Sequence, residues 1–202
     1  GARLERFLGA PAGMGGAGPV VAVDTDLSDP HEGGQRVMVL RFGNGARVVW
    51  KPRALAAEAA WHDLVRWCAA HGAPVRLGAA PVLDCGSHGW MGFVPQAPQL
   101  TAAAAPEFWR RAGGLLAVMH LLRGSDLHHE NVHVADGVPV PVDLEAMLQP
   151  DLALVPEVEP ALRADQAARR WLEGSVLAVG LLPREQRLAG RPVRTGALAA
   201  AG

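Results

Sequence analysis

One polar loop and the β-hairpin expected after it constrain the structure of this chain most strongly. The loop covers Gly124–Asn131, and two short valine-rich runs, Val132–Val134 and Val138–Val142, then flank an Asp-Gly pair. Two such runs joined by Asp-Gly predict a hairpin with a tight turn. Asp143, which follows the hairpin, is therefore expected to return to the side of Asn131, which precedes it.

The polar residues of this segment have the spacing of a phosphoryl-transfer site. Asp126 and Asn131 are five positions apart, as in the D-x-x-x-x-N catalytic loop of kinases. Such a site needs one carboxylate to orient the attacking hydroxyl and further oxygen ligands to hold Mg²⁺. We predict the first role for Asp126 and the second for Asn131 and Asp143. Glu145 either assists the metal or is a surface carboxylate, and His128 shapes the loop or contacts phosphate.

Lys51, the single lysine of the chain, is predicted to hold the nucleotide phosphates. Val37–Phe42 and Arg47–Lys51 have strand character and flank an Asn-Gly turn at Asn44, which indicates another hairpin. An amphipathic helix is predicted over Ala56–His71, because apolar residues recur at helical spacing and a glycine follows. A lysine that ends a strand and precedes a helix is suited to act as a point charge on phosphate oxygens.

The remaining segments are predicted to mix short strands with helices, so the fold class is expected to be α+β. Short strands are expected within residues 75–95, and helices over Pro106 to about Leu122 and around 160–172. An apolar segment, Ser175–Leu182, ends at a proline. The side chains predicted on the buried side of the helix over residues 56–71 are Ala60, Leu64, Trp67 and Cys68. Four tryptophans at helical positions are predicted to lie in the core: Trp61, Trp67, Trp109 and Trp171.

Composition and charge exclude several classes of protein. A formal net charge of −1 over 202 residues gives no overall attraction to nucleic acid or to an anionic membrane. The apolar runs fall far short of the roughly 20 residues that a membrane-spanning helix needs. Cys68 and Cys85 match no zinc or redox spacing. We expect a reduced pair in a cytoplasmic protein, with a disulfide between them as the alternative.

Four segments of the chain together carry the motifs of one enzyme family. Residues 28–34, Ser-Asp-Pro-His-Glu-Gly-Gly, are similar to G-D-x-H-x-x-G, and residues 48–53, Val-Val-Trp-Lys-Pro-Arg, are similar to V-Y-K-P-R. Residues 124–131 are similar to G-T-D-x-H-x-E-N, and residues 141–145 to I-D-x-E. With these motifs the chain resembles the dehydratase domain of class II lanthipeptide synthetases, the enzymes of lantibiotic biosynthesis.

This resemblance implies a fold similar to that of protein and lipid kinases, with two lobes. A flexible segment, residues 1–19, would precede an N-lobe with a small antiparallel sheet, residues 20–100. A partial and mostly helical C-lobe would occupy residues 101–202. The chain would then be a truncated part of a longer enzyme that also contains a C-terminal cyclase domain and the residues for elimination.

The resemblance also implies a two-step reaction on Ser and Thr residues of a ribosomal precursor peptide. ATP with Mg²⁺ would phosphorylate the hydroxyl, and elimination of the phosphate would then leave a dehydroamino acid. The residues implied for catalysis are Asp29, His31, Lys51, Asp126 and His128, and Arg53 is implied to bind the nucleotide with Lys51, Asn131 and Asp143.

The chain departs from the family motifs at three positions. Ser28 replaces a glycine, Gln35 stands where an arginine usually follows, and Gly92 occupies an acidic position. These differences are expected either to weaken the activity or to mark a divergent member. Two alternatives stay open, a small-molecule kinase of the aminoglycoside phosphotransferase type and an inactive remnant that binds the peptide.

Overall fold

The computed structural model describes residues 18–25, 36–96, 100–148, 167–168, 171–188 and 191–198. The chain forms two compact units. The first consists of Gly1–Ala73 and Gly78–Pro95, and the second of Pro74–Leu77 and Gln96–Gly202. Among the described residues, no helix combines the length and the hydrophobicity that crossing a bilayer requires.

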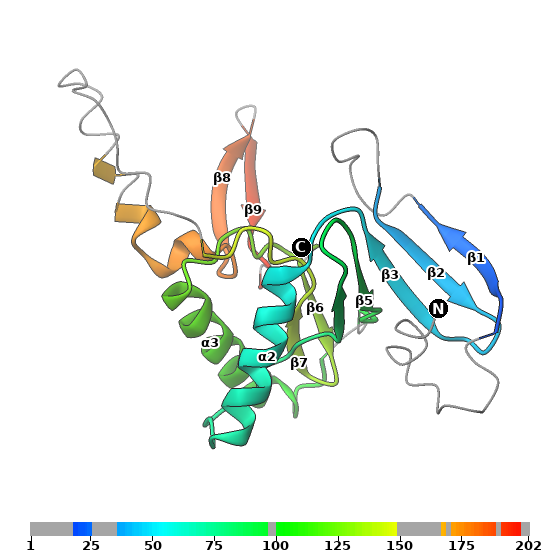
Figure 1. The fold of residues 1–202 in the computed structure, drawn as a ribbon. Coiled ribbons are helices and arrows are strands. Elements are labelled where there is room, and N and C mark those ends of the chain that lie inside the picture. Colours follow the sequence, from blue (N-terminus) through cyan, green and yellow to red (C-terminus); the bar gives the residue numbers. More distant parts are fainter. Residues whose placement is uncertain are drawn as a thin grey trace. The chain divides into compact units, whose positions relative to one another are not determined.

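The first unit is built on a five-stranded antiparallel sheet (Figure 1). Its strands follow the order β1-β2-β3-β5-β4, and every neighbouring pair runs antiparallel. The strands are β1 (Val20–Asp24), β2 (Met38–Phe42), β3 (Arg47–Lys51), β4 (Val82–Asp84) and β5 (Gly89–Gly92). Cys68 and Cys85, both in this unit, are free, as predicted. A sheet of this kind beside helices confirms the α+β class.

The turn between β2 and β3 forms as the sequence predicts. The Oδ1 atom of Asn44 accepts a hydrogen bond from Ala46 N–H at 2.9 Å. Gly45 has a φ of +85°, a conformation that glycine adopts at little cost. This turn sets the register of the two strands. Lys51 is consequently the last residue of β3.

Helix α2 (Ala56–Ala70) has the predicted extent, but a different face of it is buried. Its buried side chains are Glu58 and Trp61, and Trp61 Nε1 donates to Gly78 O at 3.0 Å. A charged residue therefore lies on the inner face, which a hydrophobicity pattern does not anticipate. The predicted buried side was wrong, because its side chains are exposed or only half-buried: Ala60, Leu64, Trp67 and Cys68.

The second unit contains helix α3 (Ala105–Leu121), which has the predicted proline in its first turn and packs against two other elements. These are strand β7 (Val138–Pro141), paired with β6 (Val132–Ala135), and the 3₁₀-helix η2 (Val176–Val179). The buried residues of α3 recur every three or four positions, as on one face of a helix. They are Phe108, Ala112, Leu115 and Met119.

A further hairpin, β8 (Arg184–Leu188) with β9 (Arg191–Thr195), was not predicted. Its two runs are rich in polar residues and show no clear hydrophobic alternation. Beside α3 and η2, the described part of the second half contains strands β6 to β9, so a mostly helical C-lobe is not confirmed. The helix predicted around 160–172 lies mainly outside the described residues.

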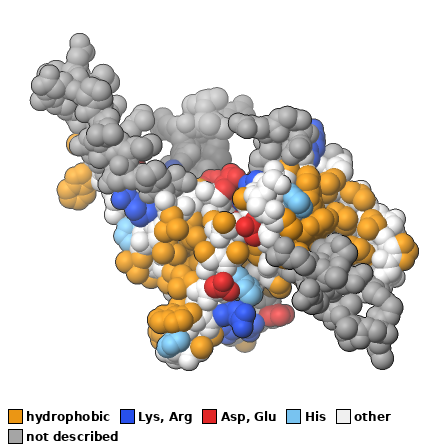
Figure 2. Space-filling view, viewed as in Figure 1, with side chains coloured by type: hydrophobic (Ala, Val, Ile, Leu, Met, Phe, Trp, Pro, Cys, Tyr) orange, Lys and Arg blue, Asp and Glu red, His pale blue; other side chains and the backbone are white. Residues whose placement is uncertain are grey.

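The tryptophans divide between core and surface. Trp61 is 2% exposed, as predicted for a core residue. The same prediction was wrong for Trp67, Trp109 and Trp171, which are 59%, 54% and 84% exposed. Trp67 on α2 and Trp109 on α3 lie off the buried faces of their helices. Figure 2 shows hydrophobic side chains over much of the visible surface of the described part.

Candidate functional site

Lys51, predicted to bind phosphate, is buried at the end of β3, with 4% of its surface exposed. In the sheet it pairs with Gly89 of β5, and on its other side Gly89 pairs with Asp84 of β4. Lys51, Gly89 and Asp84 therefore form one row across three strands. The position of the lysine is thus coupled to that of an acidic residue two strands away.

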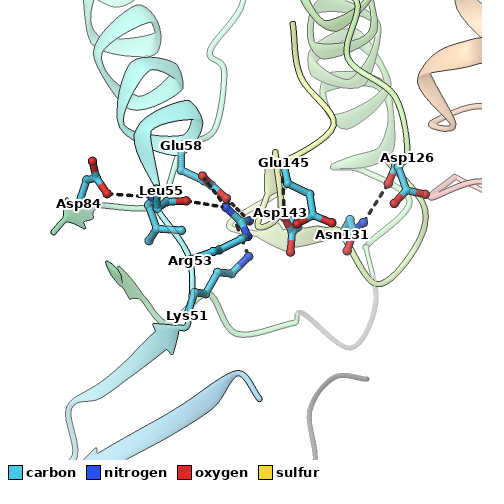
Figure 3. A network of polar contacts seen from close by, with 10 residues as sticks. Lys51, Arg53, Leu55, Glu58, Asp84, Asp126, Asn131, Asp143 and Glu145 are labelled. Carbon is cyan, nitrogen blue, oxygen red and sulfur yellow. Dashed lines mark hydrogen bonds and ion pairs between the residues drawn. The ribbon is translucent and has the colours of Figure 1, made fainter. Parts of the chain in front are cut away.

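A buried carboxylate, Glu58 in the first turn of α2, lies next to Lys51 (Figure 3). Lys51 Nζ is 3.9 Å from Glu58 Oε1, and the two side chains are 5% and 3% exposed. The guanidinium of Arg53 binds the same carboxylate, with Nη2 at 2.5 Å from Oε1 and Nη1 at 3.3 Å from Oε2. Because burial reduces screening by water, these attractions hold the two cationic side chains in place.

Glu58 was not predicted as a site residue, although the sequence contains a signal for it. Kinases pair a strand lysine with a helix glutamate, and this pair must form for the lysine to act on the phosphates. Glu58 is the third residue of the helix that follows the strand of Lys51. Its negative charge is also favourable at a helix N-terminus.

A second carboxylate of the first unit, Asp84, holds the start of α2. Asp84 Oδ1 accepts hydrogen bonds from Leu55 N–H at 2.9 Å and Gly86 N–H at 3.2 Å. These donors, chiefly Leu55, lower the pKa of Asp84 below its ordinary value of 3.8. Leu55 itself is fully buried and lies directly against Gly89. The loop that carries Arg53 is therefore fixed at its helical end.

In the second unit, the predicted catalytic loop is closed by its own asparagine. Asn131 Nδ2 donates to Asp126 O at 2.9 Å (Figure 3). The same nitrogen lies 3.2 Å from His128 Nε2. His128 Nε2 is in turn 3.7 Å from Asp126 Oδ1. Asp126 has a φ of 63°, which is uncommon outside glycine and recurs at functional sites. Its carboxylate is 59% exposed and is therefore open to solvent.

The backbone of this loop contacts the residues at the end of η2. Leu127 N–H donates to Val179 O at 2.9 Å, and the Leu127 side chain is buried. The next residue, Gly180, has a φ of +82°, and a Cβ atom there would lie 3.0 Å from Leu127 N. Only glycine meets both conditions without strain. Gly180 thus allows the close approach that supports the loop.

The hairpin β6–β7 forms as predicted and returns Asp143 to the loop. Both residues of its Asp-Gly turn have a positive φ, 51° and 67°, as a two-residue turn of this type requires. Val142 N–H donates to Asn131 O at 2.8 Å, which joins the two ends of the hairpin. Asp143 Oδ1 accepts a hydrogen bond from Glu145 N–H at 3.4 Å. Figure 3 shows Asn131, Asp143 and Glu145 at this same end.

The donor atoms at this end of the hairpin fit a hard cation such as Mg²⁺. Asn131 Nδ2 is engaged inside the loop, so Oδ1 is the atom that it offers to a ligand. Asp143 and Glu145 add carboxylate oxygens. Within the described ranges, no group of three or more His, Cys, Asp or Glu side chains is arranged to hold a metal. Mg²⁺ is commonly held by one or two carboxylates together with water and substrate phosphates, and these residues suit that mode.

Two of the predicted residues, Asp29 and His31, lie outside the described residues. The others form one group in each unit, with Lys51 and Arg53 in the first and the Asp126–Asn131 loop with Asp143 in the second. That both groups bind the same nucleotide stays a prediction, as do the individual catalytic roles.

Comparison with known proteins relates the chain to lantibiotic biosynthesis. Residues 3–202 match the family described as "Domain of unknown function (DUF4135)". A similar protein is the "Lacticin 481/lactococcin biosynthesis protein LcnDR2" of Lactococcus lactis subsp. lactis, 26% identical over 129 residues. The similarity covers 59% of this chain but 14% of the relative, so the chain spans a small part of that protein's length. The family relationship predicted from the motifs is confirmed, and the chain belongs to the DUF4135 family.

Proposed function

We propose that this chain carries the phosphotransfer part of an enzyme that dehydrates Ser and Thr residues in a ribosomal precursor peptide. One observation carries the proposal: a loop with Asp126 and Asn131, closed on itself, is joined by one hairpin to Asp143. This arrangement supplies a base and oxygen ligands for a cation within one rigid segment. The role of the relative in lacticin biosynthesis supports a peptide as the substrate.

Asp126 acts on the substrate hydroxyl in this proposal. Its carboxylate is exposed, and its backbone is held by Asn131 and by the hydrogen bond of Leu127. As the hydroxyl oxygen bonds to the γ-phosphorus of ATP, the hydroxyl proton passes to Asp126. The bond from the γ-phosphorus to the bridging oxygen breaks, and ADP leaves with that electron pair. Positioning of this kind is the main protein contribution to phosphoryl transfer.

The remaining side chains bind the phosphates and the cation. Asn131 and Asp143, assisted by Glu145, would hold Mg²⁺, which would supply positive charge against the phosphate oxygens. Lys51 contacts the phosphates, while Glu58 holds its ammonium in place. The ammonium of Lys51 and the guanidinium of Arg53 are cationic donors of the kind that bind phosphate oxygens.

The proposal includes a kinase-like arrangement of two lobes and a reaction in the cytoplasm, where ATP and newly made peptides are present. The second step, elimination of phosphate to a dehydroamino acid, and the later ring closure would use other parts of a longer protein. No residue of this chain is assigned to either step.

The test is nucleotide binding followed by a peptide assay. We expect the protein to bind Mg-ATP in isothermal titration calorimetry, and Asp143→Asn to weaken binding at least tenfold, as expected for a lost charge-assisted contact of about 1.5–3 kcal/mol. Asp136→Asn is the matched control, because Asp136 lies in the turn at the opposite end of the same hairpin, and asparagine tolerates its φ of 51°.

Mass spectrometry of a precursor peptide encoded beside the gene then identifies the reaction. A phosphate added to Ser or Thr, or one water lost from the peptide, supports the proposal. A stable phosphate on a small alcohol instead of the peptide would indicate the small-molecule kinase. No Mg-ATP binding by the unaltered protein would refute the phosphotransfer function.

A further inference from the structure

We infer that Asp84 is a positioning residue for the phosphate-binding group, fixing Lys51 through the start of α2. The inference rests on the proposed function for its consequence in catalysis, but its structural part can be tested without a nucleotide. No motif of the sequence indicates Asp84, which is the last residue of β4 and is followed by Cys and Gly.

Asp84 lies in the same row of the sheet as Lys51. Gly89 of β5 pairs with Lys51 on one side and with Asp84 on the other. Gly89 leaves room here for the buried side chain of Leu55, since a Cβ atom at this position would overlap Leu55 Cγ and Cδ1. Gly89, the partner of Lys51 in the sheet, is therefore in contact with both Asp84 and Leu55.

A hydrogen bond from Leu55 connects Asp84 to the start of α2. Leu55 is the residue before the first turn of α2, and its N–H donates to Asp84 Oδ1 at 2.9 Å. No side chain from its own segment caps the helix, so a carboxylate 29 positions away orients its start. Glu58 lies in that first turn and contacts both Lys51 and Arg53. A shift of Leu55 would move Glu58 and, with it, both cationic groups.

The electrostatics agree with this role. The backbone N–H of Leu55, followed by that of Gly86, lowers the pKa of Asp84, and His88 contributes a weaker attraction. Asp84 is therefore ionised at neutral pH, and a hydrogen bond to an ionised carboxylate is stronger than one between neutral groups. A neutral amide oxygen at the same place would still accept the hydrogen bond from Leu55 N–H, but this bond would be weaker.

The composition of the chain offers a specific probe, because Lys51 is its single lysine. Acetic anhydride at low concentration acetylates Lys51 Nζ and the N-terminus, and mass spectrometry of peptides separates the two. Burial and the contact with Glu58 should make Lys51 react slowly. We expect Asp84→Ala to raise the acetylation rate of Lys51 about tenfold, the equivalent of losing one hydrogen bond to a charged group.

Three variants make the test selective. Asp84→Asn keeps an acceptor oxygen and should stay within about threefold of the unaltered protein, since the remaining neutral hydrogen bond contributes about 1 kcal/mol. Asp63→Ala removes a carboxylate that is 80% exposed on α2 and should not change the rate. If Asp84→Ala does not fold by near-ultraviolet circular dichroism, Asp84→Glu replaces it, because it keeps the charge and displaces the acceptor by one methylene.

Binding of Mg-ATP separates this inference from the proposed function. If both hold, Asp84→Ala raises the Kd for Mg-ATP about tenfold and Asp84→Asn recovers most of the affinity. Absence of binding by the unaltered protein would refute the phosphotransfer function, whereas faster acetylation in Asp84→Ala would still support the positioning role. Equal acetylation rates in folded Asp84→Ala and the unaltered protein would overturn the inference.

Discussion

The buried contact of Lys51 with Glu58 provides the sharpest quantitative prediction. Glu58→Gln preserves the shape of the side chain and removes its charge, so no cavity forms. At 3.9 Å and an effective dielectric constant of about 20, the lost attraction between Lys51 and Glu58 is about 4 kcal/mol. Removing one partner of a buried pair typically costs about 3–5 kcal/mol. We therefore expect Glu58→Gln to lower the free energy of unfolding by about 3–5 kcal/mol.

A surface pair in the same unit provides the matched control. Arg41 Nη2 is 2.7 Å from Asp24 Oδ2, but the two side chains are 53% and 39% exposed. Water and salt screen such a pair, so Asp24→Asn should cost less than about 1 kcal/mol despite the shorter distance. The two variants thus test whether burial or distance determines the strength of an ion pair here.

The assay is urea unfolding followed by tryptophan fluorescence and far-ultraviolet circular dichroism. Trp61, buried in α2 and hydrogen-bonded to Gly78 O, reports on the helix that carries Glu58. The Glu58→Gln deficit should persist at high salt, because buried pairs are screened little. If Glu58→Gln lowered the free energy of unfolding by no more than Asp24→Asn does, the buried pair would be no stronger than the exposed pair, and this prediction would be refuted.

Three further predictions use the same unfolding assay. Gly180→Ala should lower the free energy of unfolding by roughly 1–3 kcal/mol, because alanine is strained at a φ of +82° and its Cβ would crowd the D-x-x-x-x-N loop. Gly113→Ala is the control: this position on α3 has open space for a Cβ, so the substitution should raise the free energy of unfolding by about 0.5–1 kcal/mol. Gly89→Ala should cost about 1–3 kcal/mol, because its Cβ overlaps the buried side chain of Leu55; a neutral effect would contradict the packing described. The hydrogen bonds to Asp84 lower its pKa in the folded protein below the ordinary value of 3.8. Their contribution to the free energy of unfolding is therefore complete at a pH above 3.8, and it is lost as the pH falls through the lowered pKa of the folded protein. The stability difference between the unaltered protein and Asp84→Asn should therefore shrink on acidification, and a difference that grew toward low pH would contradict this.

Local sequence signals predicted much of the fold because their causes are local. The Asn-Gly and Asp-Gly turns set both predicted hairpins. Gly45 has a positive φ in the first turn, and Asp136 and Gly137 both do in the second. The extents of α2 and α3 also followed from helical spacing and their flanking residues. The approach of Asp143 to Asn131 was predictable for the same reason, because a short hairpin brings the residues at its two ends close together.

The sequence by itself determined the strand-end position of Lys51, the D-x-x-x-x-N loop and the family. Only the tertiary structure decided which groups surround them. The Asp84 to Leu55 hydrogen bond joins residues 29 positions apart, and Glu58 is buried on a face that its charge would assign to water. Such contacts depend on how separate elements pack, and the loss of solvent around a charge is decided by its neighbours in space. No spacing along the chain encodes that environment, so burial and its partners become visible only when the chain is folded.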